Sequence, residues 1–171
     1  SEILELQAVN EGKAIGTVIE SGIESGKGVV STILITKGKL KKGDLIIVGE
    51  EFGKARLLLN EHNDELEAVT PSLPVKVYGL SSAPNAGDEL RVVDSERQGR
   101  EISSLRKQRI RTIKAGNKNA DKMQDFLKTS TDSSKQKKLA LVIKADVQGS
   151  TEAIQDSLVK LATEDVGIDI I

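Results

Sequence analysis

The stretch GKGVVSTILITKGKLKKGDLIIVG, residues 26–49, decides the fold. It contains two runs rich in β-branched residues, 29–36 and 45–48, which favour an extended backbone. Between the runs, Gly38 and Gly43 offer the positive φ that tight turns need. This pattern predicts short strands that follow one another through sharp turns.

Similar runs occur on both sides of this stretch. Residues 14–23, 54–59, 75–80 and 89–93 are also β-rich, and Gly, Pro, Asn or Asp bounds each of them. Further turn signals are Lys37-Gly38, Lys42-Gly43-Asp44 and Ala86-Gly87-Asp88. One strand about every ten residues indicates a closed or nearly closed antiparallel β-barrel over residues 1–94, because closure leaves no exposed strand edge.

The periodicity changes at Ser95. The string Ser95-Glu96-Arg97-Gln98 fits a capping box, in which Ser95 accepts a hydrogen bond from the Gln98 amide and the Gln98 side chain reaches back. Apolar residues then recur at helical spacing, which predicts a helix over about 96–115. These residues are Ile102, Leu105, Ile110 and Ile113.

Gly116 and Asn117 are typical of a helix end, and Met123, Phe126 and Leu127 predict a second short helical segment. Residues 129–138, TSTDSSKQKK, contain no apolar side chain and are expected to form a linker. Residues 95–138 are therefore interpreted as a basic helix and a polar linker.

Residues 139–171 predict the first part of an α/β domain. Residues 139–145 are expected to form a buried strand and 166–171 a second strand. Gly149 is expected to permit the bend before a helix capped by Ser150. The apolar residues of that helix are expected to form one face, namely Ala153, Ile154, Leu158 and Leu161. Two strands and one helix bury little surface, so this unit is expected to be a truncated part of a domain or to be completed by another chain.

Composition excludes several classes of protein. The chain of 171 residues has no cysteine, so it has no disulfide or thiolate chemistry, and no apolar run approaches the roughly 20 residues that span a bilayer. The net charge of −1 is unevenly distributed. Residues 97–138 hold 13 basic and 4 acidic side chains, whereas 1–96 hold 10 and 16. A positive middle segment can attract nucleic acid phosphates or can be a solvated helix face.

Three strings imitate nucleotide-binding motifs without their spacing. In GIESGK, residues 22–27, Ser21 stands where a phosphate loop needs Gly, and a hairpin turn explains the string better. In NKNAD, residues 117–121, the Asp lies one place too far for guanine recognition. Residues 146–149, DVQG, match a γ-phosphate-sensing string but are better explained by a strand-to-helix turn. The chain is therefore expected to be noncatalytic and to bind no cofactor itself.

Other chemistry is scarce. The single histidine, His62, lies in a polar turn and does not support a metal site or a catalytic triad. Tyr78, Phe52 and Phe126 are scattered and are interpreted as packing residues, so RNA contact would depend on charge rather than on base stacking. The acidic cluster Glu61, Asp64, Glu65 and Glu67 lacks the spacing of a calcium loop and is expected to be solvated.

Taken together, several strings resemble translational GTPases, in the β-barrel that follows the GTPase domain. They are GKGVVST at 26–32, KGKLKKGD at 37–44 and IIVG at 46–49. PVKVYGL at 74–80 and PNAGD at 84–88 resemble bacterial-type translation initiation factor two in particular. VIKADVQGS at 142–150, with Glu152, Ala153 and Ile154, is similar to the opening of its next domain.

The resemblance implies a role in translation initiation. The barrel would dock on small-subunit ribosomal RNA, while the helix and the α/β unit would relay the state of a GTPase domain. GTP and magnesium would bind upstream of Ser1, and initiator tRNA would bind through domains beyond Ile171. The implied compartment is the cytoplasm, with the mitochondrial matrix left open. A rival interpretation is the barrel of an elongation-type or selenocysteine-type factor, which holds an aminoacyl end.

The candidate RNA contacts are basic residues, chosen because lysine and arginine neutralise phosphate. Those on the barrel are Lys37, Lys39, Lys41, Lys42 and Arg56, and those on the helix are Arg100, Arg106, Lys107, Arg109 and Arg111.

Overall fold

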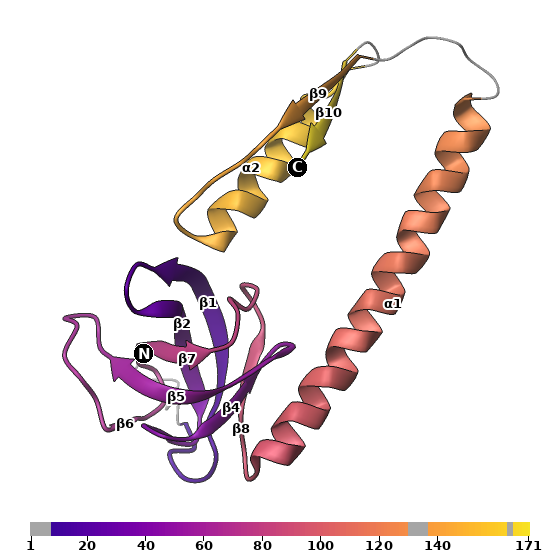
Figure 1. Ribbon diagram of the computed structural model, residues 1–171. Coiled ribbons are helices and arrows are strands. Elements are labelled where there is room, and N and C mark those ends of the chain that lie inside the picture. Colours follow the sequence, from indigo (N-terminus) through magenta and orange to yellow (C-terminus); the bar gives the residue numbers. More distant parts are fainter. Residues whose placement is uncertain (1–7, 130–136, 164–165) are drawn as a thin grey trace, which may run out of the picture. The chain divides into compact units, whose positions relative to one another are not determined.

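A closed antiparallel barrel of six strands forms the first part of the chain, as the sequence predicts (Figure 1). The computed structural model describes the backbone of residues 8–129, 137–163 and 166–171, and the side chains of 8–113, 139–163 and 166–171. Around the barrel the strand order is β1-β2-β7-β5-β4-β8, and β8 closes it by pairing with β1. The strands are β1 (Ile15–Glu24), β2 (Gly28–Lys37), β4 (Leu45–Val48), β5 (Glu51–Leu59), β7 (Pro74–Leu80) and β8 (Glu89–Val93).

Alternating residues of these strands fill the barrel. Ile33 and Ile35 of β2 are 0% and 1% exposed, and Val75 and Val77 of β7 are equally well buried. Successive side chains of a strand point to opposite faces, so a period of two places every second residue in the core. Burial of each such side chain contributes roughly 1.5–3 kcal/mol to folding.

Two further strands of two residues each were not predicted. β3 (Leu40–Lys41) pairs antiparallel with β6 (Ala68–Val69), and both Leu40 and Val69 are fully buried. Segments this short carry no detectable alternation, so only their packing against the barrel reveals them.

The predicted turns are confirmed. Gly38, Gly43 and Gly87 have φ of 71°, 93° and 86°, in the region that favours glycine. The string at 22–27 lies at the tip of the β1–β2 hairpin, where the Lys27 amide donates to the Glu24 carbonyl at 3.3 Å. That string therefore forms a hairpin turn and not a phosphate loop.

The helix after the barrel, α1 (Glu96–Thr129), is longer than predicted. Its amino-terminal cap is confirmed, because the Gln98 amide donates to Ser95 Oγ at 3.3 Å. The predicted stop at Gly116 and Asn117 is wrong, and the two expected helical segments are one unbroken helix (Figure 1). A glycine inside a helix costs only about 1 kcal/mol, and the following residues include the helix formers Lys, Ala, Met, Gln and Leu with no proline. NKNAD at 117–121 lies within this helix.

The last part of the chain has the predicted β-α-β order. β9 (Lys137–Leu141) and β10 (Val166–Ile170) pair in parallel, and α2 (Gln148–Lys160) lies between them in the chain. The first strand begins and ends earlier than the predicted 139–145, so the expected linker at 129–138 is shortened by Lys137 and Lys138. Linker residues 130–136 lie outside the described residues.

Three local predictions for this part are wrong. Ser150 does not cap α2, because the helix begins two residues earlier and Ser150 lies inside its first turn. Gly149 does not form the bend before the helix, because it lies inside the first turn of α2. The burial predicted for the first strand is also wrong, since Leu139 is 50% exposed.

The chain divides into two compact units. One consists of Ser1–Ser104 with Asp146–Gly149, and the other of Leu105–Ala145 with Ser150–Ile171. The first turns of α1 thus belong to the barrel unit and its remainder to the second unit. In the described residues, no helix is both long and apolar enough to cross a membrane.

Candidate nucleic-acid interface

Three of the predicted barrel contacts project from one continuous segment. Lys37 ends β2, and Lys39 and Lys41 follow at intervals of two. The intervening Gly38 and Leu40 are buried while all three lysines are exposed. In the described structure their ammonium groups make no ion pair, so their charge is available to a ligand.

Lys42 differs from these three lysines. Its ammonium group forms an ion pair with Glu65, on the loop that leads to β6. The hydrogen bond to Glu65 and its negative charge raise the pKa of Lys42 above its ordinary value. Lys42 is therefore partly neutralised, and it is a weaker candidate for a phosphate contact than its neighbours.

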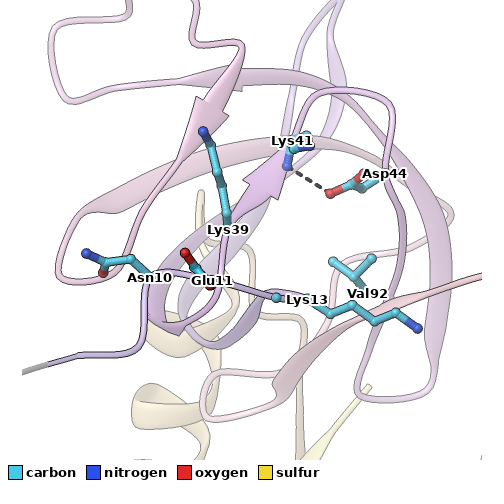
Figure 2. Close-up of a pocket in the computed structure, with 8 residues that line it drawn as sticks. Asn10, Glu11, Lys13, Lys39, Lys41, Asp44 and Val92 are labelled. Atoms are coloured by element: carbon cyan, nitrogen blue, oxygen red, sulfur yellow. Dashed lines mark hydrogen bonds between the residues drawn. The ribbon is translucent and has the colours of Figure 1, made fainter.

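Lys39 and Lys41 line a pocket of about 450 Å³ (Figure 2). The opposite wall comes from the segment before β1 and includes Asn10, Glu11 and Lys13. Sequence reasoning missed Lys13, because only the fold brings residue 13 beside residue 39. The backbones of Lys13 and Lys39 lie side by side and form an isolated parallel β-bridge.

Backbone hydrogen bonds hold the two walls of this pocket together. The Gly38 amide donates to the Val9 carbonyl at 2.7 Å, and the Lys39 amide donates to the Gly12 carbonyl at 3.0 Å. A Cβ at position 38 would lie 2.3 Å from the carbonyl oxygen of Lys13. Only glycine permits this approach, so the pocket is built by the main chain before any ligand arrives.

Two charged groups of the pocket are already engaged. Lys13 Nζ lies 2.5 Å from Asp94 Oδ2, and Asp44 Oδ2 accepts a hydrogen bond of 2.8 Å from the Lys41 amide. Figure 2 shows the Lys41–Asp44 bond at one side of the pocket. The amide is neutral, so Asp44 keeps its charge, and the charges without an ion pair in the pocket are the ammonium groups of Lys39 and Lys41 and the carboxylates of Glu11 and Asp44.

The other predicted contacts lie elsewhere. Arg56 is exposed on β5 and does not line the pocket. Arg100 belongs to the barrel unit and is paired with Glu96 of the same helix at 2.5 Å. Arg106, Lys107, Arg109 and Arg111 belong to the second unit. At 100° per residue, Lys107 and Arg111 share one side of α1, while Arg106 and Arg109 lie on another. The helix cations therefore do not form a single stripe.

The opposite end of the β1–β2 hairpin carries a polar cluster. Tyr78 is 4% exposed, its hydroxyl donates to Glu24 Oε2 at 3.0 Å, and Lys27 Nζ lies 5.7 Å from the centre of its ring. Burial, then the hydrogen bond to Glu24 and its charge, raise the pKa of Tyr78 to about 12. Tyr78 is thus a packing residue with a satisfied hydroxyl, as predicted.

His62 occupies a surface turn, as predicted. Asn60 Oδ1 accepts hydrogen bonds from the amides of His62 and Asp64, and the imidazole lies beside Glu61 at 3.3 Å. Among the residues whose side chains the structure describes, 8–113, 139–163 and 166–171, no group of three His, Cys, Asp or Glu could hold a metal ion.

Two family models match the chain in succession. Residues 13–93 match elongation factor G domain 2, and residues 112–171 match translation-initiation factor 2. The first match covers the barrel from Lys13 to the end of β8, so this is the second-domain barrel of translation factors and not a GTPase domain. The second match covers about half of α1, from Thr112 on, and all of the β-α-β part. The barrel and the carboxyl-terminal part both match translation factors, so the chain is part of a translation factor.

Within that class, the two matches are consistent with a chain of the translation-initiation factor 2 type. It is also similar to the GDP-bound aIF5B from Aeropyrum pernix, with 23% identity, a TM-score of 0.47, and coverage of 95% of this chain and 27% of that one. A bacterial selenocysteine-specific elongation factor is similar at 16% identity and a TM-score of 0.46, over 52% of this chain and 16% of that one. The chain thus spans about a quarter of the length of the archaeal factor, and its assignment rests on the two family models.

Proposed function

We propose that this chain is a noncatalytic binding and coupling part of a translation initiation factor. Its barrel docks on ribosomal RNA of the small subunit, and α1 with the β-α-β part relays the state of a GTPase domain during delivery of initiator tRNA. The observation that carries this proposal is the order of the two family matches, a barrel followed directly by an initiation-factor segment.

Charge supports the docking step. Lys37, Lys39 and Lys41 are exposed within one short segment, and their ammonium groups form no ion pair in the described structure. Residues 1–96 carry more acidic than basic side chains, so attraction to RNA is local to that edge. Such binding is modest and weakens as salt screens the phosphates.

Packing supports the relay step. Ser103 of α1 is 7% exposed and donates a hydrogen bond of 2.6 Å to the carbonyl oxygen of Glu50 in the β4–β5 turn. The first turns of the helix are thereby fixed to the barrel. A helix that continues unbroken to Thr129 transmits a displacement of its anchored end over many turns.

The nucleotide chemistry belongs elsewhere in the complete factor. The phosphate-loop-like string at 22–27 is a hairpin tip, and the guanine-like string at 117–121 is helical, so neither fits a nucleotide. In this proposal GTP and magnesium bind to a separate GTPase domain, initiator tRNA contacts other domains, and the factor works in the cytoplasm.

Co-sedimentation with purified small ribosomal subunits tests the docking step. We expect binding at low salt that weakens as salt rises, and weaker binding by a chain that carries Lys37→Ala, Lys39→Ala and Lys41→Ala together. Lys27→Ala, at the other end of the β1–β2 hairpin, is the matched control. Absence of binding at every salt concentration would overturn the docking proposal.

The rival assignment, an elongation-type barrel that holds an aminoacyl end, makes a different prediction. It requires the chain to protect aminoacyl-tRNA from deacylation, which the initiation proposal does not. The match of residues 112–171 to initiation factor 2 favours initiation. A measured deacylation rate that falls when the chain is added would favour the rival.

A further inference from the structure

The string DVQG, Asp146–Gly149, is the part of the chain after Ser104 that belongs to the barrel unit. It completes the connection between β9 and α2, and Gln148 and Gly149 are the first residues of that helix. The string imitates a nucleotide-binding motif, but the partners that the structure gives it are residues of the barrel. These contacts assign it a mechanical role.

Backbone pairing joins this segment to β1. Val147 and Gly22 form an isolated antiparallel β-bridge. A Cβ at position 22 would stand 2.8 Å from the carbonyl oxygen of Asp146. The φ of Gly22 is not positive, so no turn requires glycine there, and glycine inside a strand weakens the strand. The close approach of Asp146 is therefore the physical reason for glycine at this position.

The side-chain amide of Gln148 adds a polar contact. Its Nε2 donates to Asn85 Oδ1 at 2.5 Å, and its Oε1 lies 3.4 Å from Ser21 Oγ. Ser21 is 3% exposed and donates its hydroxyl hydrogen to the Pro84 carbonyl at 2.5 Å. The backbone amide of Asn85 donates to Asp88 Oδ2 at 2.9 Å. Bonds within the barrel thus hold the barrel side of the contact in place.

The contact is small and incompletely packed. Val147 and Gln148 are only partly buried, and Asp146 is exposed. A pocket of about 260 Å³ remains between the segment and strands β1, β2 and β7, whereas a well-packed interior leaves few voids larger than a water molecule. Segments with few buried apolar contacts open locally at low free-energy cost. The segment is therefore suited to leave the barrel and return.

We propose that residues 146–149 form a clasp that opens and closes on the barrel and, when closed, couples the barrel directly to the start of α2. The inference deepens the proposed function and rests on it, because it gives the relay a second route. Along the chain, a displacement passes from the barrel through residues 105–145 before it reaches α2. Through the closed clasp it passes from Gly22 and Asn85 to Gln148, and opening the clasp leaves only the long route.

Paramagnetic broadening of NMR signals tests whether the clasp closes in solution. The chain has no cysteine, so Ser150→Cys places a single nitroxide label directly after the clasp. We expect this label to broaden the amide signals of Gly22 and Asn85. The signal of Gly38 should stay sharp, because Gly38 lies about 25 Å along β2 from Val30, the partner of Gly22, and broadening falls steeply with distance.

Gln148→Ala should open the clasp without changing the barrel. It removes one hydrogen bond, so hydrogen exchange of the amides of residues 146–149 should become roughly two- to tenfold faster, and the broadening should decrease. Asn85→Ala should have the same effect, and the two changes together should add little, because both remove the same bond. Gln108→Ala, at an exposed glutamine of α1, is the matched control and should change neither measurement.

Gly22→Ala opens the clasp from the barrel side. The added Cβ excludes the carbonyl of Asp146 from its present position, so we expect a larger loss of broadening at Asn85 than Gln148→Ala causes. The amide spectrum of the remaining barrel residues reports whether the barrel stays folded. If it does not, the Gln148 and Asn85 variants still decide whether these contacts hold the segment.

The outcomes separate the clasp from the proposed function. If the label at position 150 broadens neither Gly22 nor Asn85, the clasp is overturned, while co-sedimentation with small subunits still decides the docking proposal. Broadening and exchange that Gln148→Ala and Asn85→Ala both leave unchanged would also overturn it. A chain that shows the closed clasp but binds no small subunit would retain the clasp and overturn the docking proposal.

Discussion

Gly99 of α1 lies so close to Phe52 of β5 that a Cβ at position 99 would stand 2.2 Å from the ring atom Cε2. One turn further along the helix, Ser103 donates its hydroxyl hydrogen to the carbonyl oxygen of Glu50. Two small residues spaced by four thus let α1 pack against the β4–β5 hairpin. This joint is where the helix and the barrel become one unit.

Gly99→Ala should therefore loosen the joint. Alanine favours a helix by about 1 kcal/mol over glycine, but overpacking against Phe52 costs about 1–3 kcal/mol. We expect a net loss of stability in thermal unfolding and faster amide hydrogen exchange over residues 96–104. The same change in a Phe52→Ala background removes the clash, so there it should stabilise. Equal effects in both backgrounds would show that the Gly99–Phe52 contact does not matter.

Gly38→Ala should be among the more damaging single substitutions. At position 38 the backbone has φ of 71°, and the added Cβ would meet the backbone oxygen of Lys13 at 2.3 Å. Gly26→Ala is the matched control, because Gly26 has φ of 81° with nothing within 4 Å. The control should lose about 1–2 kcal/mol from the left-handed conformation alone. Denaturant unfolding should show a clearly larger loss for Gly38→Ala, and equal losses would contradict the close approach.

Tyr78 should titrate with a midpoint near pH 12 in the folded chain and near 10 after unfolding. The chain has one tyrosine and no tryptophan, so phenolate absorbance reports this group alone. Because folding raises the pKa, the stability contributed by the neutral phenol is fully present below pH 10. It is lost as the pH rises through 12.

Glu24→Gln sharpens this test. It removes the negative charge beside the hydroxyl, so the midpoint should fall below that of the wild type while burial keeps it above 10. Tyr78→Phe serves as the blank for the absorbance change. A midpoint that Glu24→Gln does not move would contradict the Tyr78–Glu24 hydrogen bond.

Ser31→Ala should preserve or increase stability. Ser31 is fully buried in β2, and its hydroxyl has no hydrogen-bond partner in the described structure. An unpaired buried hydroxyl costs about 1–3 kcal/mol, which alanine avoids at the expense of a small void. Ser103→Ala is the opposite case, because it removes a made hydrogen bond and should destabilise by about 0.5–1.5 kcal/mol. Calorimetric unfolding of the two variants should therefore show shifts of opposite sign.

The barrel was predictable because its signals are local. The alternation of Ser31, Ile33 and Ile35 and the glycines of the turns mark strands and turns within a few residues, and closure follows from their number and spacing. β3 and β6 were missed because a strand of two residues is too short to show an alternation of apolar and polar side chains. The helix end at Gly116 was wrong because one glycine is a weak stop when strong helix formers follow it.

The candidate site was only half predictable. Lys37, Lys39 and Lys41 lie within five residues of one another, so the sequence alone shows that they lie close together. It cannot show that Asn10, Glu11 and Lys13 form the opposite wall of the pocket, since that depends on contacts between distant segments. Whether the helix cations contact RNA stays a prediction.

The sequence by itself determined the closed barrel, the cap of α1 and the resemblance to initiation factor 2, because each depends on the order of short motifs. Tertiary structure alone decided that Gly38 brings Lys13 beside Lys39, that Gly99 lies against Phe52, and that Lys42 forms an ion pair with Glu65. The physical reason is the separation along the chain over which each kind of interaction acts. Propensity and periodicity act over a few residues, whereas steric fit and charge pairing act between whichever residues the folded chain brings into contact.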